Sequence, residues 1–227
     1  MSIVQIENVT RDYTQGSHTV RALRGVDLTI EPGEFVAIMG ASGSGKTTLL
    51  NLVGGLDGPT TGSVRIEDHE LAGMTAAERS ELRRDRIGFV FQAYNLVPVL
   101  SAVENTEMVL ILRGEAEATR REMAMKMLGA VGLEGMENRR PNELSGGQQQ
   151  RVAIARAIAG APALVLADEP TANLDSETGN EIIALMAKLN QEQGITFVFA
   201  THDPKVMAAA GRVIVMEDGL VKEDRRS

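Results

Sequence analysis

The segment EFVAIMGASGSGKT, residues 34–47, constrains the fold of this chain more than any other part of the sequence. Its last eight residues match the pattern G-x-x-x-x-G-K-[ST] in full. An apolar run typical of a buried strand precedes this loop, and a helical pattern over residues 48–52 follows it. Glycines there let backbone N–H groups converge on phosphates. An ordinary glycine-rich turn would not explain eight matched positions, so the sequence predicts a nucleoside triphosphate site.

The predicted phosphate loop supplies most of the candidate ATP-binding residues. Lys46 can reach the β- and γ-phosphates, and the hydroxyl of Thr47 can bind Mg²⁺. ATP and Mg²⁺ are therefore the expected cofactors. The candidates from the loop and the residue after it are Gly40, Ala41, Ser42, Gly43, Ser44, Gly45, Lys46, Thr47 and Thr48.

Two acidic residues follow another apolar run, LVLAD. Asp168 ends this run and Glu169 comes directly after it. In a parallel sheet both carboxylates would leave the strand beside the phosphate loop. Asp168 could then bind the metal ion, and Glu169 could orient and deprotonate the attacking water. Either residue alone could instead be a solvated start of the loop DEPTANLD, but the pair at the end of so apolar a run favours the metal and base roles.

Apolar runs alternate with helical patterns through much of the chain. Runs typical of buried strands occur at residues 163–168, 196–201 and 212–216, and a helical pattern covers residues 176–193. Buried strands that alternate with helices indicate an α/β fold with a mostly parallel sheet. The first 35 residues alternate apolar and polar positions instead, which predicts strands around a turn. We expect a P-loop NTPase core with an antiparallel β part at its N-terminus.

The middle of the chain is helical in pattern, with candidate helices at residues 116–131 and 148–159. The predicted organisation is a single domain over all 227 residues. Residues 1–90 and 161–227 would form the α/β core, and residues from about 91 to 160 would form an inserted helical subdomain.

A second glycine turn, LSGGQQQ, begins at Leu144. Ser145 followed by Gln148 is a capping box at the start of a helix. A capping box alone does not call for Gly146 and Gly147 in the first turn, where each glycine costs about 1 kcal/mol of helix propensity relative to alanine. We infer that something approaches this part of the backbone closely.

Composition narrows the class of protein. The formal net charge is -8 and aromatic residues make up 3% of the chain, so duplex or single-stranded nucleic acid is not an expected partner. The chain has no cysteine, which excludes disulfides and thiolate chemistry. The N-terminus lacks the pattern of a signal peptide, and the longest apolar runs are far shorter than a membrane span of about 20 residues. A cytoplasmic protein is expected.

Three single residues are ambiguous when taken alone. His202 could be a turn residue after the run TFVFAT, and Gln92 could be a surface amide after GFVF. Tyr13 could be a half-buried strand residue.

The motifs together resemble the ATP-binding cassette of ABC transporters, in the order of that family. They are GASGSGKT, Gln92, LSGGQ, LVLADE, Asn173–Asp175 and His202, and they cover nearly the whole chain. The sequence around these motifs is similar to that of the bacterial subgroup of lipoprotein-releasing, macrolide-export and antimicrobial-peptide-resistance ATPases. That subgroup usually has Glu where Gln148 stands and Gly where Ala172 stands.

The resemblance implies a role for each ambiguous residue. Tyr13 would stack on the adenine, Gln92 would sense the metal and the γ-phosphate, and His202 would hold the γ-phosphate and act in catalysis with Glu169. In this family two cassettes pair head to tail, and each LSGGQ faces the phosphate loop of the other copy. The residues expected to act on the partner's ATP are therefore Ser145, Gly146, Gly147, Gln148 and Asp175.

The expected function is that of the ATPase subunit of an ABC transporter. It would form a homodimer around two Mg-ATP and drive a separate integral membrane permease subunit from the inner face of the cytoplasmic membrane. The apolar segment Ala93–Leu112 would border the groove for that subunit, although most of it is expected to pack the helical subdomain. Alternatives are an ABC ATPase that acts on DNA or ribosomes without transport, and a P-loop kinase for a small molecule.

Overall fold

A computed structural model describes residues 2–16 and 18–226 of the chain, and a six-stranded sheet forms its centre. The strand order is β10-β9-β3-β8-β7-β6, and only the β9–β10 pair is antiparallel. The strands of this sheet are β3 (Phe35–Met39), β6 (Ile87–Phe91), β7 (Leu164–Asp168), β8 (Thr196–Ala200), β9 (Arg212–Glu217) and β10 (Leu220–Arg226). The predicted mostly parallel sheet is confirmed.

Side chains of the central strands alternate between two hydrophobic clusters. Phe197 and Phe199 of β8 pack into one cluster, whereas Val198 and Ala200 pack into the other. Every residue of β8 is buried, as expected for a parallel strand that is covered on both faces. The two clusters therefore mark the two covered faces of the sheet.

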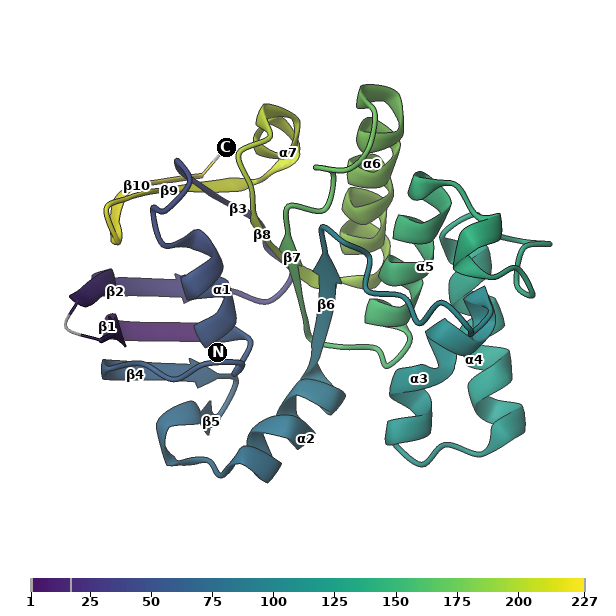
Figure 1. Cartoon of the computed structure of the whole chain (residues 1–227), viewed down its shortest axis with the longest axis horizontal. Helices are drawn as coiled ribbons and strands as arrows, with labels where there is room; N and C mark the ends of the chain where they lie inside the picture. The colour runs from purple at the N-terminus through teal and green to yellow at the C-terminus, as the bar shows by residue number, and fades with distance from the viewer. Residues whose placement is uncertain (1, 17, 227) are drawn as a thin grey trace.

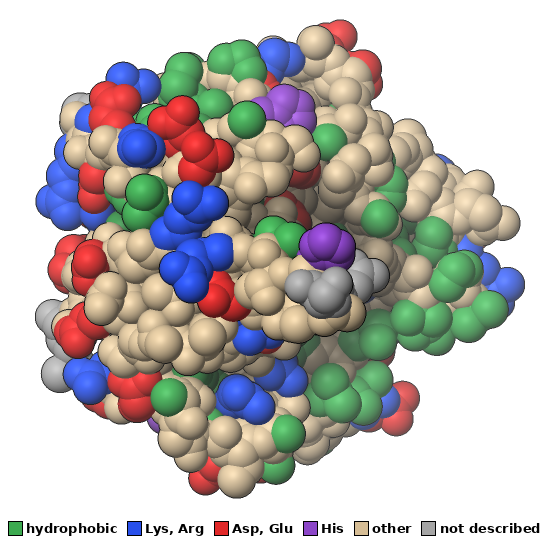
Figure 2. All heavy atoms as spheres, turned by 60° about the vertical axis from the view of Figure 1, so that its left-hand side comes forward, with side chains coloured by type: hydrophobic (Ala, Val, Ile, Leu, Met, Phe, Trp, Pro, Cys, Tyr) green, Lys and Arg blue, Asp and Glu red, His purple; other side chains and the backbone are tan. Residues whose placement is uncertain are grey.

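A second, antiparallel sheet covers one of these faces, with strand order β2-β1-β4-β5. Its inward residues alternate with exposed ones, which is typical of a half-buried strand. The strands are β1 (Val4–Gln15), β2 (His18–Ile30), β4 (Thr61–Ile66) and β5 (His69–Glu70). Figure 2 shows the side of the molecule that carries this sheet, where acidic and basic side chains are interspersed. The predicted antiparallel N-terminal part is confirmed.

The helices divide between the two faces (Figure 1). α1 packs with the antiparallel sheet in one cluster, and α5 and α6 pack in the other. The helices are α1 (Lys46–Val53), α2 (Ala76–Arg86), α3 (Ala102–Leu112), α4 (Glu117–Ala130), α5 (Gly146–Ile158), α6 (Ser176–Gln193) and α7 (Pro204–Ala209), with short 3-10 turns η1 (Leu71–Gly73) and η2 (Pro141–Glu143). Within the described residues, no helix combines the length and the apolar character needed to cross a membrane.

Three helices, α2, α3 and α7, lie outside the ranges predicted as helical. The first two begin at a capping box. α2 follows Thr75, whose hydroxyl accepts from the Glu78 N–H, and α3 follows Ser101, which caps Glu104 in the same way. The predicted helices themselves differ from α1, α4 and α5 by one or two residues at their ends. The division into core and helical subdomain remains a prediction, and α3, α4 and α5 pack against one another within the proposed subdomain.

Candidate active site

The phosphate loop joins β3 to α1, and its glycines have backbones that other residues rarely adopt. Gly40, Gly43 and Gly45 have φ of 153°, 82° and 103°. A Cβ on Gly40 would lie 2.3 Å from the Met216 carbonyl oxygen, and one on Gly45 would lie 2.7 Å from that of Ala22. No side chain caps α1, so its first N–H groups remain available to an anion.

Lys46 folds back over this loop. Its buried ammonium donates to the carbonyl oxygens of Gly40 at 2.7 Å and Ala41 at 3.0 Å. These contacts hold the positive charge of Lys46 against the backbone of the phosphate loop itself. The side chain is thus placed to reach phosphate oxygens at the same position.

Asp168 and Thr47 meet across the sheet edge. The Thr47 hydroxyl donates to Oδ1 of Asp168 at 3.4 Å. The pKa of the Asp168 carboxyl is raised, mainly by burial and also by the charge of Glu169. The Thr47 hydrogen bond and the charge of Lys46 act in the opposite direction. A hydroxyl and one carboxylate are oxygen donors of the kind that Mg²⁺ takes together with substrate phosphates. Among the described residues no group of three or more His, Cys, Asp or Glu could hold a metal ion by itself. Thr47 and Asp168 fit a metal ion that substrate phosphates would also bind.

Glu169 is held from the neighbouring strand. Its N–H donates to the Ala200 carbonyl at 2.9 Å, and its own backbone has φ of 46°. The Thr201 hydroxyl donates to Oε2 at 3.0 Å, while Nδ1 of His202 lies 2.6 Å from Oε1. The carboxylate of Glu169 is therefore fixed at both oxygens, whereas the imidazole of His202 is 75% exposed.

Gln92 follows the end of β6 and pairs with the loop after β7. Its amide donates to Oδ1 of Asn173 at 3.3 Å, and the Asn173 amide donates to the Gln92 carbonyl at 2.9 Å. These bonds join Gln92 to the loop that leads to Asp175.

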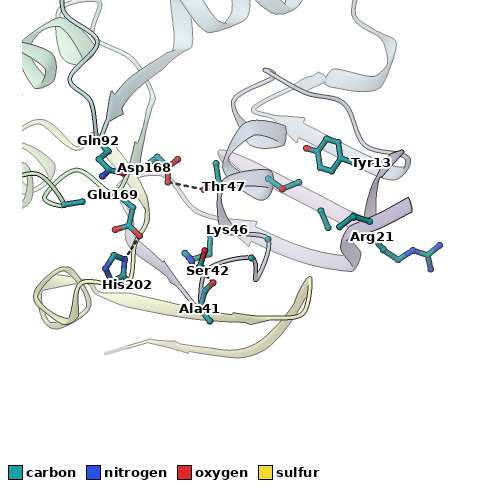
Figure 3. A pocket seen from close by; sticks show the side chains of 16 residues that line it. Tyr13, Arg21, Ala41, Ser42, Lys46, Thr47, Gln92, Asp168, Glu169 and His202 are labelled. Carbon is teal, nitrogen blue, oxygen red and sulfur yellow. Dashed lines mark hydrogen bonds and ion pairs between the residues drawn. The ribbon is translucent and has the colours of Figure 1, made fainter. Parts of the chain in front are cut away.

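A cavity of about 820 Å³ brings most of these side chains together. In Figure 3, Gln92, Asp168, Glu169 and His202 gather at one end, Tyr13 and Arg21 lie at the other, and Lys46 and Thr47 lie between them. The predicted residues that line it are Tyr13, Ala41, Ser42, Gly43, Gly45, Lys46, Thr47, Thr48, Gln92, Asp168, Glu169 and His202. Gly40 and Ser44 belong to the phosphate loop but are not among the residues that line the cavity.

Four lining residues were absent from the sequence prediction, namely Val20, Arg21, Ala22 and Ala172. Val20 pairs with Tyr13 across the β1–β2 hairpin. The sequence pattern predicted strands around a turn without their register, so it could not place β2 residues opposite Tyr13.

The second glycine turn lies outside the cavity lining. Figure 1 places α5 and α1 on opposite sides of β6 and β7. Ser145 caps α5 by accepting from the Gln148 N–H at 3.3 Å, and Gln148 accepts from the Ser145 N–H at 3.0 Å. The predicted capping box is confirmed, and none of the predicted trans residues lines the cavity of its own chain.

Close packing explains part of this turn. A Cβ on Gly147 would lie 2.4 Å from Cγ2 of Thr178, and one on Gly146 would lie 2.9 Å from the Tyr94 hydroxyl. Asp175 caps α6 by accepting from the N–H groups of Glu177 and Thr178. The pKa of the Asp175 carboxyl is lowered, and the hydrogen bond from the Thr178 hydroxyl is the largest cause. The close approach inferred from the glycines is thus made, at Gly147, by a residue of the same chain.

Comparison with known proteins shows which family this chain resembles and over how much of its length. The model of the ABC transporter family matches residues 23–172. MacB, a macrolide export ATP-binding/permease protein of Rhodopseudomonas palustris, is 49% identical over 99% of this chain. The chain spans only about a third, 34%, of that relative's length.

A relative of similar length comes from Methanocaldococcus jannaschii. Its uncharacterized ABC transporter ATP-binding protein MJ0796 is 47% identical over 99% of this chain and 97% of its own length. The solved dimer of the MJ0796 cassette in a post-hydrolysis state, bound to ADP and Pi, covers 98% of both chains with a TM-score of 0.90. The cassette CbiO1 from Clostridium perfringens, part of the transporter complex CbiONQ, is 30% identical with a TM-score of 0.89.

Proposed function

The chain belongs to the ABC transporter family and is an ATP-binding cassette of the ABC ATPase type, and we propose that it is the ATP-hydrolysing subunit of a transporter. In this proposal it forms a homodimer around two Mg-ATP and drives conformational change in a separate membrane permease subunit. It would work at the inner face of the cytoplasmic membrane. The MacB relatives are named ATP-binding/permease proteins, which supports a permease partner.

One observation carries the proposal of a dimer. The cavity gathers a phosphate loop, Asp168, Glu169 and His202, whereas α5, which Ser145 caps, lies across β6 and β7 from α1. Two copies placed head to tail would bring the α5 N-terminus of each to the cavity of the other. The N–H groups of Gly146 and Gly147 would then face the γ-phosphate held by the partner copy.

Lys46 and the loop backbone would bind the phosphates of ATP. The ammonium of Lys46 offsets phosphate charge in the ground state and in the transition state. Thr47, Asp168 and Gln92 would hold Mg²⁺, which when bound neutralises charge on the β- and γ-phosphates. Tyr13, at the far end of the cavity, would contact the adenine.

Glu169 is proposed as the general base. Thr201 holds its Oε2, and the backbone bond to Ala200 holds its main chain. The Oε1 atom is in contact with His202 in this structure. Movement of the exposed His202 ring toward the γ-phosphate would free that oxygen to accept a proton from the attacking water.

A groove beside the helical region is the proposed contact for the permease. Its volume is about 510 Å³, and it is lined by apolar side chains that include Leu56, Phe89, Val109 and Leu112, with arginines beside them. Leu112 is 68% exposed, whereas Leu110 is fully buried. Only part of the apolar segment 93–112 therefore packs inside, and the rest is available to a partner.

Glu169→Gln tests the proposed function. The amide keeps the size and polarity of the side chain but cannot act as a base, so ATP turnover should be lost while ATP binding persists. The variant should accumulate as an ATP-bound dimer on a sizing column. Near-normal hydrolysis by this variant would remove Glu169 from its role, and a chain that binds no ATP would contradict the proposal as a whole.

A further inference from the structure

Tyr13 is fixed by two residues that do not line the cavity. Its hydroxyl donates to Oδ2 of Asp57 at 2.7 Å. The same carboxylate accepts from Nη2 of Arg11 at 2.7 Å through Oδ1, and the Arg11 guanidinium carbon lies 4.5 Å from the centre of the Tyr13 ring. One carboxylate therefore fixes both the ring and the cation that covers one face of the ring.

Asp57 is itself anchored to the helix that begins in the phosphate loop. Its N–H donates to the carbonyl of Asn51 in α1 at 3.2 Å. The Gly58 N–H donates back to Oδ1 of Asp57 at 2.8 Å. The position of the Tyr13 ring is thus coupled to α1, although Tyr13 itself belongs to the β1–β2 hairpin.

Within the described part of the chain, Arg11 forms its ion pair with Asp57 alone. Its Nε is buried without a hydrogen-bond partner among the described residues. Its side chain is 24% exposed and that of Asp57 is 25% exposed, so water only partly screens the pair. The ring and the Asp57 carboxylate are what hold the guanidinium where it is.

We propose that Asp57 and Arg11 are positioning residues for the base of the nucleotide. The guanidinium of Arg11 covers one face of the Tyr13 ring, and Asp57 stops the ring from turning, so that a purine stacks on the uncovered face. This inference rests on the proposed contact of Tyr13 with adenine. It adds that the stacking surface is built jointly by the hairpin and by the loop after α1, and that the two residues act only on the base and not on the phosphates.

The test compares a ligand that has a base with one that has none. Binding of ATP and of inorganic tripolyphosphate, each with Mg²⁺, is measured by calorimetry for the unmodified chain, Asp57→Ala and Tyr13→Phe. Loss of one hydrogen bond to the ring should weaken ATP binding roughly two- to tenfold in each variant. Tripolyphosphate affinity should not change, and KM for ATP should rise while kcat stays the same.

Tyr13→Ala provides the background that separates positioning from a structural effect. Removing the ring should weaken ATP binding by roughly tenfold or more. In that background Asp57→Ala should have no further effect on ATP affinity, because there is no ring left to position. Glu70→Gln is the control, since it neutralises the carboxylate of a partly exposed pair with Arg65 on the same sheet, and it should leave ATP affinity unchanged.

Three results would overturn the inference without contradicting the proposed ATPase activity. One is an Asp57→Ala variant that binds ATP as tightly as the unmodified chain. Another is an equal loss of ATP and tripolyphosphate affinity, which would indicate damage to the phosphate loop. A Tyr13→Ala variant with unchanged ATP affinity would also overturn it. Only an unmodified chain that binds neither ligand would contradict the ATPase proposal itself.

Discussion

The chain has two glycine turns that open helices, and the structure gives them different chemistry. In the first, Gly40, Gly43 and Gly45 have positive φ and no side chain caps α1. In the second, neither glycine has a positive φ, and Ser145 caps α5 with a reciprocal bond from Gln148. The first turn leaves its N–H groups available to an anion, whereas the second uses one of them internally.

The difference shows what each turn needs from its surroundings. The first turn lies in a cavity that also contains Asp168 and Glu169, so a phosphate bound there would meet the proposed metal ligand and the proposed base in the same chain. The second turn packs against Thr178 of α6. It does not line the cavity that contains Asp168 and Glu169. An anion bound at the N-terminus of α5 would therefore lie outside the cavity of its own chain.

The largest effect is expected from a change in the first turn. Lys46→Ala removes the charge that offsets the phosphates, and loss of such a preorganised group costs roughly 3 kcal/mol or about 100-fold in rate. Because the charge acts on bound ATP as well, affinity should also fall. ATP hydrolysis and ATP binding are measured on the same preparation, and unchanged values of both would contradict the phosphate-loop assignment.

A mixture of two damaged chains tests whether the second turn acts on the partner. Lys46→Ala damages the first turn, and Ser145→Arg places a bulky side chain in the second. Each homodimer should be nearly inactive. A mixed dimer has one site with both defects and one site with neither, so mixing should restore ATP-dependent pairing and some hydrolysis.

The alternative arrangement gives the opposite result for the same mixture. If the second turn served its own chain, every site would carry one defect and mixing would restore nothing. The measurement is the dimer fraction on a sizing column with ATP, under conditions in which the unmodified chain pairs. Thermal unfolding of each variant shows that both are folded.

The sequence correctly predicted those elements that are determined by a few adjacent residues. The phosphate loop, the strand that ends at Asp168 and the capping box at Ser145 each follow from a few adjacent residues. It missed α2 and α3, although Thr75 with Glu78 and Ser101 with Glu104 carry the same capping signal as Ser145. α2 is mostly polar, and α3 has its polar residues together at 104–107 before an apolar run, so helical periodicity did not mark either of them.

Contacts between distant segments were beyond the sequence. Nothing in the pattern places Asp57 against Tyr13 or Thr178 against Gly147, because both contacts depend on how separate elements pack. The hairpin register that brings Val20 to the cavity depends on register shifts along the β1–β2 pair, which a simple alternation does not encode. Roles for Tyr13 and His202 came from family resemblance and remain proposals.

Gly147→Ala asks whether the second turn has its glycine for packing or for an approaching phosphate. The new methyl would lie 2.4 Å from Cγ2 of Thr178, and such overpacking costs about 1–3 kcal/mol. Thr178→Ser removes that methyl and keeps the hydroxyl that donates to Asp175 at 2.6 Å. The double variant should therefore regain thermal stability. We expect its ATP-induced pairing to stay impaired, and full recovery of pairing would show that packing within the chain is the whole reason for this glycine.

The smallest effect is expected from the cap itself, and the chain offers a matched control. Ser145→Ala and Ser101→Ala each remove a serine N-cap from a helix with a capping box, and such a loss costs about 1 kcal/mol of stability. Urea denaturation should show similar losses for both. Because the Ser145 hydroxyl is proposed to face the partner's γ-phosphate, only Ser145→Ala should also weaken ATP-induced pairing. Equal pairing by the two variants would leave Ser145 with a capping role alone and would assign phosphate recognition at the second turn to its backbone N–H groups.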